Sequence, residues 1–305
     1  MLQPTETGNN SRSTGWSCKL CLFDPDLSHS DENHILTSIL FTGDGCFISL
    51  FNKETNFLVA LLHYQFDLLP GQVFTESGSD LYRLSLEQVF KELNDKHLPL
   101  NNVRLVYYSE RNVIIPGAYY KTDDGEKYYL LNYHLNTGEL IKNQYIRNLD
   151  AYNVYGLPAV IASFARVHFK DSPVLSANGL LINNLLKGRT LDSPLEVYLH
   201  SYSNSLKIFV LNEDNLLYCN DFAIHTAEDA AYYAVFVANQ LKPEQDTPVW
   251  LTGNFTQGSK VHRLISNYLG STGFPAMPGE IKLSPALSDI SFSRYFIILT
   301  VSTCA

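Results

Sequence analysis

The sequence predicts a mixed α/β protein in which one structural unit occurs twice. Six short apolar segments form two triplets, one near the start of the chain and one in its second half. They span 35–41, 46–51, 57–63, 195–200, 205–211 and 215–223. Each triplet is followed by an amphipathic segment and then by an isolated apolar run, a pattern that indicates a strand meander, a helix and a further strand. Two similar lobes leave a cleft between them, and ligands often bind in such clefts.

The composition agrees with two lobes that each bury a core. Of the 305 residues, 45% are hydrophobic and only 17% are charged, so both lobes have enough apolar residues for packing. The 19 Tyr and 17 Phe favour sheets over long helical bundles. We place a loose N-terminal tail at 1–22, because its beginning is rich in turn-forming residues, the first lobe at 23–190 and the second lobe at 191–305.

The first lobe begins with a hairpin signal. Asp44-Gly45 lies between two β-prone segments, and both residues tolerate the positive φ that a tight hairpin turn needs. After a long connector at 67–83, Ser85-Leu86-Glu87-Gln88 fits a capping box and predicts that a helix begins at Ser85. The rest of the lobe is predicted to contain strands at 102–108, 111–116, 128–133 and 141–146 and a helix at 158–168.

The second lobe repeats this order. Thr226 and Asp229 form a variant of the capping box and predict a helix at 227–241, which Pro243 ends. The remaining elements are a buried parallel strand at 248–252, a loop at 253–258, a helix at 259–269, a strand at 280–284 and a closing helix at 291–301. Each lobe is thus expected to contain a three-stranded antiparallel meander extended by parallel strands, with flanking helices.

Charge and hydropathy exclude several classes of partner. The formal net charge is −9, from 22 basic and 31 acidic residues, and no run of Lys or Arg offers the positive surface that a nucleic acid needs. No stretch reaches the ~20 apolar residues of a membrane span. The 5 cysteines are too few and too scattered for a disulfide framework. We therefore expect a cytoplasmic protein that binds no nucleic acid and has no membrane span.

Familiar catalytic motifs are missing from the sequence. It has no Gly-x-Ser-x-Gly elbow, no P-loop, no Gly-x-Gly-x-x-Gly and no His-Glu-x-x-His, so we assign no catalytic residue and no metal site. His63 and His200 fall at comparable strand positions, and we interpret them as edge or boundary residues because no orienting carboxylate is near them in sequence. Cys18 and Cys21 have the spacing of a redox pair or half a zinc site, and we interpret them as an incidental pair near a loose end.

The doubled element order resembles the actin-like ATPase (ribonuclease H-like) fold, which actin, sugar kinases and actin-like pilus assembly proteins share. A narrower resemblance rests on a set of short segments. They are Leu27-Ser28, Asp44-Gly45-Cys46-Phe47, Glu228-Asp229 with Tyr232-Tyr233, Asn239-Gln240-Leu241, and Pro248 to Gly253 with Asn254. In order and spacing they are similar to an uncharacterised bacterial family, the domain of unknown function number 3822, which resembles degenerate actin-like ATPases. The resemblance covers about residues 24–305.

The resemblance implies a nucleotide cleft between two glycine-containing hairpins, each with an Asp that organises Mg²⁺ or the attacking group. In the first hairpin, Gly43-Asp44-Gly45 carries the acid at a shifted position, whereas the second hairpin, 201–205, has neither Asp nor Gly. Thr252-Gly253-Asn254 and Gly258 partly match the base-binding glycine pair that the resemblance implies. The same segment can also be interpreted as a tight strand-to-helix turn. The residues of this vestigial nucleotide cleft are Asp44, Gly45, Thr252, Gly253, Asn254 and Gly258. ATP hydrolysis is not expected.

Three functions remain open. The first is a non-catalytic actin-like module that binds or scaffolds a protein partner. The second is an ATP- and magnesium-dependent enzyme of the kinase type, with Asp44 as its lone acid. The third is a structural homodimer that associates through strand edges or through a tyrosine-rich surface between Tyr107 and Tyr133. No cofactor is assigned unless the second function holds.

Overall fold

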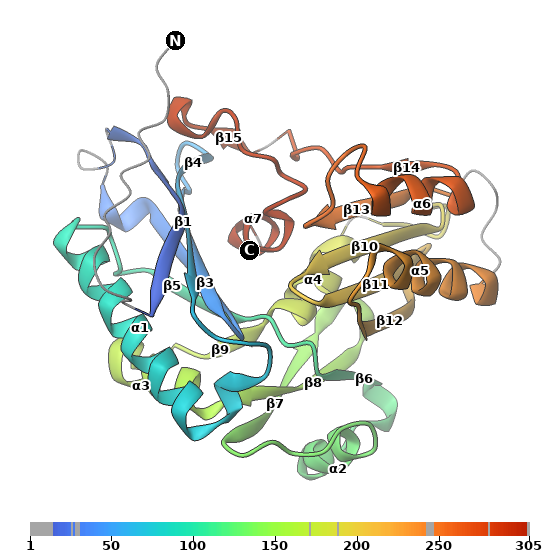
Figure 1. Ribbon diagram of the computed structural model, residues 1–305, viewed down its shortest axis with the longest axis horizontal. Coiled ribbons are helices and arrows are strands. Elements are labelled where there is room, and N and C mark those ends of the chain that lie inside the picture. Colours follow the sequence, from blue (N-terminus) through green and yellow to red (C-terminus); the bar gives the residue numbers. More distant parts are fainter. Residues whose placement is uncertain are drawn as a thin grey trace.

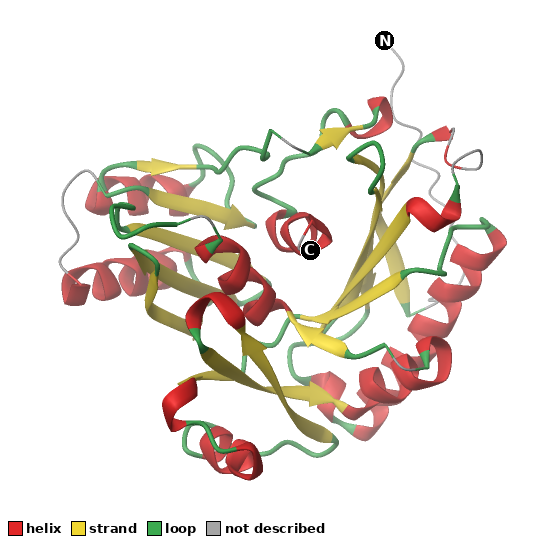
Figure 2. Cartoon of the chain, turned by 180° about the vertical axis from the view of Figure 1, so that it is seen from behind, coloured by secondary structure: helices red, strands yellow, loops and turns green. Residues whose placement is uncertain are grey.

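The computed structural model describes residues 15–25, 27, 31–170, 172–187, 189–241, 247–279 and 281–303. Over these residues the chain forms two large mixed sheets and a smaller three-stranded sheet. Helices cover the outer faces of the two large sheets, and the C-terminal helix lies between them (Figure 1; Figure 2 shows the same layers from behind). None of the helices in this part of the chain is long and apolar enough to cross a membrane.

The first large sheet has the strand order β1-β4-β3-β2-β5-β9, and β15 also pairs with β4. Its strands are β1 (Trp16–Phe23), β2 (Ile35–Thr42), β3 (Gly45–Asn52), β4 (Phe57–Phe66), β5 (Val103–Tyr107), β9 (Val174–Ser176) and β15 (Lys282–Leu283). β2, β3 and β4 form the expected antiparallel meander, and β5 and β9 extend it in parallel. Through β15, the end of the predicted second lobe joins the sheet of the first.

The second large sheet has the order β12-β11-β10-β13-β14. Its strands are β10 (Glu196–Tyr202), β11 (Ser205–Asn212), β12 (Asn215–Ala223), β13 (Val249–Gly253) and β14 (Thr272–Gly273). This order matches β4-β3-β2-β5-β9 strand for strand, with the same antiparallel meander and the same parallel extension. The two-lobed fold predicted from the sequence is therefore confirmed.

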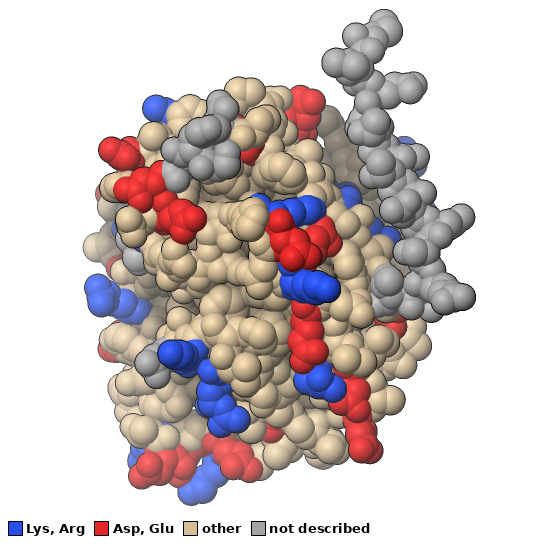
Figure 3. Space-filling view, turned by 90° about the vertical axis from the view of Figure 1, so that its left-hand side faces the viewer, with Lys and Arg blue, Asp and Glu red and all other residues tan. Residues whose placement is uncertain are grey.

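Amphipathic helices cover the outer face of each large sheet. They are α1 (Glu76–Asp95) and α3 (Ala159–Phe169) on the first sheet, and α5 (Ala227–Leu241) and α6 (Lys260–Leu269) on the second. In α1, Tyr82, Leu86, Val89 and Leu93 form one buried stripe at helical spacing. The opposite face is charged, and Figure 3 shows acidic and basic side chains interspersed across this side of the molecule. This face therefore lacks the concentrated positive charge that binds nucleic acid.

Two apolar helices, α4 (Ala177–Leu186) and α7 (Phe296–Thr303), fill the space between the large sheets. Their shared core includes Phe47 and Leu61 from the first sheet and Phe209 and Leu211 from the second. A helix that is apolar on all sides is stable only when it is buried, and α7 packs against β2, β3 and α4. The two lobes are consequently joined by a continuous hydrophobic core.

The small sheet is an insertion between β5 and α3. It consists of β6 (Asn112–Pro116), β7 (Glu139–Ile146) and β8 (Ala151–Pro158) in the antiparallel order β6-β8-β7, with the short helix α2 (Gly125–Leu130) packed against it. The buried carboxylate of Glu139 holds this unit together. It accepts hydrogen bonds from the Tyr129 hydroxyl at 2.6 Å and from the Arg111 guanidinium at 2.8 Å.

Two predictions at the beginning of the chain were wrong. Residues 16–22, predicted as part of a loose tail, belong to β1, which pairs with β4 and is fixed to α1 by a hydrogen bond from Trp16 Nε1 to Gln88 Oε1. The first helix begins at Glu76 and not at Ser85, because the Thr75 hydroxyl caps it by accepting from the Gly78 amide. Position 78 must be a glycine, because a Cβ there would lie 2.0 Å from the Gln72 carbonyl oxygen.

Other differences concern segments whose conformation depends on tertiary contacts. The predicted strand at 128–133 begins inside helix α2, because the hydrogen bond from Tyr129 to Glu139 outweighs the strand propensity of the tyrosines. The closing helix begins at Phe296 instead of 291. The predicted strand at 280–284 is reduced to Lys282–Leu283, and its first position, 280, lies outside the described residues. Helix α4 and strand β8 were not predicted.

Candidate functional site

The first hairpin places Asp44 at the junction of the two lobes. Its Oδ1 atom accepts a hydrogen bond from the Thr42 hydroxyl at 3.0 Å and another from the Tyr202 hydroxyl at 2.9 Å. Gly45 follows the turn at a point where a Cβ would lie 2.1 Å from the Tyr64 carbonyl oxygen. The close approach of β3 and β4 is therefore sufficient to explain why position 45 is a glycine.

Tyr202, at the end of β10 in the second hairpin, reaches across to the first hairpin. Its hydroxyl also lies 3.1 Å from Thr42 Oγ1, and its ring contacts Phe47 and Tyr108 edge-on. Burial, and then the charge of Asp44, raises the pKa of Tyr202 well above its ordinary value, so the hydroxyl stays protonated and donates. A phenol thus lies between the two turns that the actin-like resemblance assigns to phosphate.

The crevice behind Tyr202 is packed with side chains. The remaining cavity has a volume of about 20 Å³, room for about one water molecule. Its lining residues are Leu40, Thr42, Phe47, Tyr108, His200, Tyr202, Arg294, Tyr295, Ile297 and Ile298. A second hollow of about 180 Å³ opens on the outer side of Tyr202, which is less than the few hundred Å³ of typical ligand pockets.

The two histidines do not lie at comparable strand positions, because β4 corresponds to β12 and not to β10. Both lie on interior strands, which corrects their interpretation as edge residues. His63 is on β4, between β1 and β3, and His200 is on β10, between β11 and β13. Burial lowers the pKa of His63 to about 4 and that of His200 to about 3, so both rings are neutral near pH 7. They supply no positive charge for a phosphate.

The other predicted cleft residues make structural contacts. Thr252 is buried and its hydroxyl lies 2.9 Å from His200 Nδ1. The Gly253 amide donates to the Ser293 carbonyl, and the Asn254 amide donates to the Ser201 carbonyl. Gly258 lies in the loop before α6, where its amide donates to His262. Two residues of β10 contact the predicted cleft residues: Tyr202 contacts Asp44, and His200 contacts Thr252. Gly258 is not part of this set of contacts.

A buried ion pair that the sequence did not reveal forms one wall of this region. The Lys207 ammonium on β11 binds the Asp221 carboxylate on β12, and the side chains are 0% and 8% exposed. Asn112 of β6 donates to the same carboxylate at 3.2 Å, and the ammonium lies 5.4 Å from the centre of the Tyr108 ring. These contacts tie the small sheet to the second large sheet. Among the described residues, no cluster of three metal-binding side chains occurs.

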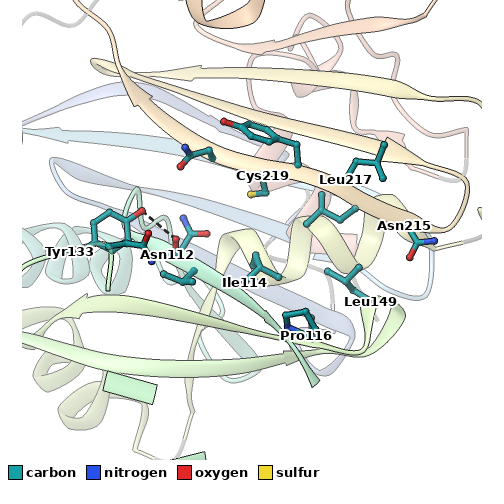
Figure 4. Close-up of a pocket in the computed structure, with 14 residues that line it drawn as sticks. Asn112, Ile114, Pro116, Tyr133, Leu149, Asn215, Leu217 and Cys219 are labelled. Atoms are coloured by element: carbon teal, nitrogen blue, oxygen red, sulfur yellow. Dashed lines mark hydrogen bonds between the residues drawn. The ribbon is translucent and has the colours of Figure 1, made fainter. Parts of the chain in front are cut away.

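A groove of about 660 Å³ opens beyond this wall, between β6 and β12. Figure 4 shows Asn112, Ile114 and Pro116 along one side and Asn215, Leu217 and Cys219 along the other. Tyr133 and Leu149 lie nearer the two ends of the first side. None of the residues that line the groove is charged.

Both long sides of the groove are strand edges. Within the described residues, β6 pairs only with β8, and β12 pairs only with β11. The hydrogen bonds from the Gly156 amide to Arg111 and from the Gly117 amide to Asp150 fix which β6 residues face β8. In an antiparallel ladder every second residue points away, so Asn112, Ile114 and Pro116 direct their backbone groups away from β8.

The same argument applies to β12. The Ile224 amide donates to the Asn204 carbonyl, so positions 218, 220 and 222 face β11. Cys219 and Asp221 therefore direct their backbone groups away from β11. The groove was not predicted, because strand edges are recognisable only once the strand order is known.

Comparisons with known proteins agree with the fold. A Bacteroides thetaiotaomicron protein with actin-like ATPase fold and unknown function superposes with a TM-score of 0.73 at 17% identity, over 92% of this chain and 99% of that chain. A structure of the PilM–PilN type IV pilus biogenesis complex superposes with a TM-score of 0.53 at 11% identity, over 88% of this chain and 98% of that chain. No curated protein matches by sequence.

The actin-like ATPase fold is thus shared with solved structures. At these sequence identities the superpositions show similarity of fold and nothing about function. A protein-family model described as "Protein of unknown function (DUF3822)" matches residues 26–271. This match includes both hairpins and the strands that form the groove, and the chain belongs to the DUF3822 family.

Proposed function

We propose that this protein is a non-catalytic actin-like module that binds an extended segment of a partner protein in the groove between β6 and β12. The observation that carries the proposal is the pair of unpaired strand edges on opposite sides of one groove. A segment in extended conformation can hydrogen-bond to an exposed edge by adding a strand to the sheet. Here one inserted strand would meet an edge on each side.

An inserted strand sets a requirement on the spacing of the two edges. Neighbouring strands lie about 4.8 Å apart, so an inserted strand needs about 10 Å between the two edges. At one end of the groove the side chains of Asn112 and Asp221, one from each edge, meet at 3.2 Å. The groove beyond them has the volume to hold several residues of an extended segment.

The chemistry of the lining favours a peptide over a charged small molecule. Proteins commonly protect a free edge with Lys or other charged side chains, and neither side of this groove has one among its lining residues. The nearby Asp221 carboxylate is already neutralised by Lys207. Leu217, 46% exposed, gives an apolar contact for a side chain of the segment. The groove thus offers backbone hydrogen bonds and neutral side chains.

The interlobe crevice supports the non-catalytic part of the proposal. Tyr202 lies between the two hairpins and donates to Asp44, the acid of the first hairpin. The PilM–PilN structure is a complex of two proteins, which supports protein binding as a function that this fold can have. Fold similarity is an analogy here, and the groove geometry carries the argument.

The test uses random twelve-residue peptides displayed on phage and selected on the purified full chain. Leu217→Arg places a long charged side chain in the groove. Leu140→Arg is the matched control, because Leu140 is 40% exposed on β7 and does not line the groove. We expect selected peptides to bind the wild type and the control equally and to bind Leu217→Arg at least about tenfold more weakly, a loss of about 1.4 kcal/mol.

Backbone pairing is checked by hydrogen exchange on the same complexes. A bound strand should protect the amides of Ile114 and Cys219, which point away from their partner strands. Selection that yields no binder, or binders that tolerate Leu217→Arg, would contradict the proposal. Sedimentation of the free protein at micromolar concentration tests the alternative function, a structural homodimer. If the wild type is a dimer and Leu217→Arg dissociates it, the groove is occupied by a second copy of the chain.

A further inference from the structure

Cys18 and Cys21 lie on the edge strand β1, on the side of the sheet that faces α1. In a regular strand, residues three apart point to opposite faces. The register of β1 on β4 shifts between Cys18 and Leu20, so Lys19 is the extra residue of a bulge. Because of this bulge both sulfurs lie on one face, whereas Leu20 and Leu22 pack into the interlobe core on the other.

The end of helix α1 places charged side chains beside the two thiols. The Lys96 ammonium lies 3.5 Å from Cys21 Sγ and also forms an ion pair with Glu92. Cys18 is exposed and Cys21 is half-buried, so small molecules in solution can reach the pair. This environment differs from that of Cys46, which is fully buried.

The two sulfurs have different protonation states. The neighbouring Cys18 thiol, together with the charge of Lys96, lowers the pKa of Cys21 to about 6 despite partial burial. The neighbouring Cys21 and burial raise the pKa of Cys18 above its ordinary value, and the Cys18 thiol donates a hydrogen bond to the Leu20 carbonyl at 3.2 Å. Cys21 is therefore a thiolate near pH 7, and the thiolate is the nucleophilic form of cysteine. Cys18 remains a thiol on the same face of β1.

We propose that Cys18 and Cys21 form a reactive dithiol site that reduces low-molecular-weight disulfides and becomes a Cys18–Cys21 disulfide. The Cys21 thiolate attacks one sulfur of the disulfide RS–SR, forms a mixed disulfide and releases RS⁻. Cys18 then loses its proton to water, and its sulfur attacks Cys21 Sγ and displaces the second RS⁻. Two protein thiols are oxidised, one RS–SR is reduced, and the released thiolates take up the two protons.

The test uses oxidised glutathione with the full chain near neutral pH, followed by peptide mass mapping. We expect the peptide that contains both cysteines to lose two hydrogen atoms. In Cys18→Ser, the reaction should stop at a glutathione adduct on Cys21. In Cys21→Ser, modification of Cys18 should be at least about tenfold slower, because burial still holds the pKa of Cys18 above its ordinary value when Cys21 is gone. Cys46→Ser is the control and should leave the reaction unchanged.

A pH profile of the intact dithiol tests whether the reaction depends on the Cys21 thiolate or only on the solvent exposure of the two cysteines. Lys96→Met keeps the stem of the side chain but removes its charge, so the midpoint of the rate against pH should move upward relative to the wild type. This measurement does not depend on whether the Cys→Ser variants fold. Equal rates for Cys18→Ser and Cys21→Ser, or a final state with two glutathione adducts and no internal disulfide, would overturn the proposal.

Discussion

The interlobe crevice and the groove between β6 and β12 lie on either side of one wall, yet one is filled and the other is open. In the crevice, Tyr202, Phe47 and Tyr108 leave a cavity of about 20 Å³. In the groove, two strand edges enclose about 660 Å³. The wall between them consists of Lys207, Asp221 and Asn112.

The difference favours the groove over the crevice as the proposed binding site. The residues that the actin-like resemblance assigns to a nucleotide have protein partners: Asp44 binds Tyr202, Thr252 contacts His200, and the amides of Gly253 and Asn254 donate to carbonyl groups. A ligand in the crevice would have to displace these contacts. In the groove, an added strand would supply partners to edges that have none among the strands described.

The largest expected effect on stability comes from removing one member of the Lys207–Asp221 ion pair in the wall. Lys207→Met removes the cation and leaves the Asp221 carboxylate buried without its partner. Removal of one member of a buried ion pair costs about 3–5 kcal/mol, and we expect a loss of that size in the free energy of unfolding measured with urea. The double variant Lys207→Met/Asp221→Leu should recover most of the loss. An equally unstable double variant would mean that the lysine stabilises the wall by packing.

A second prediction tests whether the crevice is dry. The pKa of His200 is about 3 in the folded protein and about 6.5 in an unfolded chain, so the unfolded state binds the proton first as the pH falls. The stability that comes from keeping this ring neutral is therefore lost progressively below about pH 6.5. At about pH 5 the loss should be on the order of 2 kcal/mol relative to neutral pH.

The control for the pH experiment is His200→Gln, which can still hydrogen-bond to Thr252 but does not titrate. Urea unfolding at several pH values should give a shallower dependence for this variant than for the wild type. His63 titrates in both proteins and so cancels in the difference. Identical slopes would show that water reaches His200 and that the crevice is open.

Local patterns in the sequence were sufficient to predict the repeated core of the fold. The Asp44-Gly45 turn and the alternating apolar runs predicted both meanders, and Pro248 to Thr252 predicted the parallel strand β13. β8 could not be predicted in this way, because Asn153 interrupts its apolar pattern. Its side-chain NH₂ group donates to the Ser176 hydroxyl, 23 positions away, at 2.6 Å.

The candidate sites were harder to predict because they depend on long-range contacts. Tyr202 was predicted only as part of the turn of the second hairpin, and its partner Asp44 is 158 positions away. The bulge that brings Cys18 and Cys21 to one face of β1 is a property of the pairing with β4. The pair was therefore interpreted as incidental when only its spacing was known.

The smallest expected effect concerns the Tyr202 hydroxyl itself. Tyr202→Phe keeps the ring in the crevice and removes the hydrogen bond to Asp44. Since Asp44 is partly exposed and keeps its contact with Thr42, the loss in unfolding free energy should be only about 1 kcal/mol. Thermal unfolding with Mg-ATP should show no stabilisation of the wild type or of this variant, because the ring still occupies the space between the hairpins.

Binding of Mg-ATP tests whether the interlobe crevice is closed to ligands, as the comparison with the groove implies. A ligand present at about 100 times its Kd stabilises the native state by about 2.7 kcal/mol, well above the effect of the lost hydroxyl. Stabilisation of that size in the wild type, abolished by Asp44→Asn, would show that Tyr202 swings out of the crevice and that the second, kinase-type function applies. Stabilisation that survives Asp44→Asn would place the nucleotide away from the hairpins, and the crevice would still be closed.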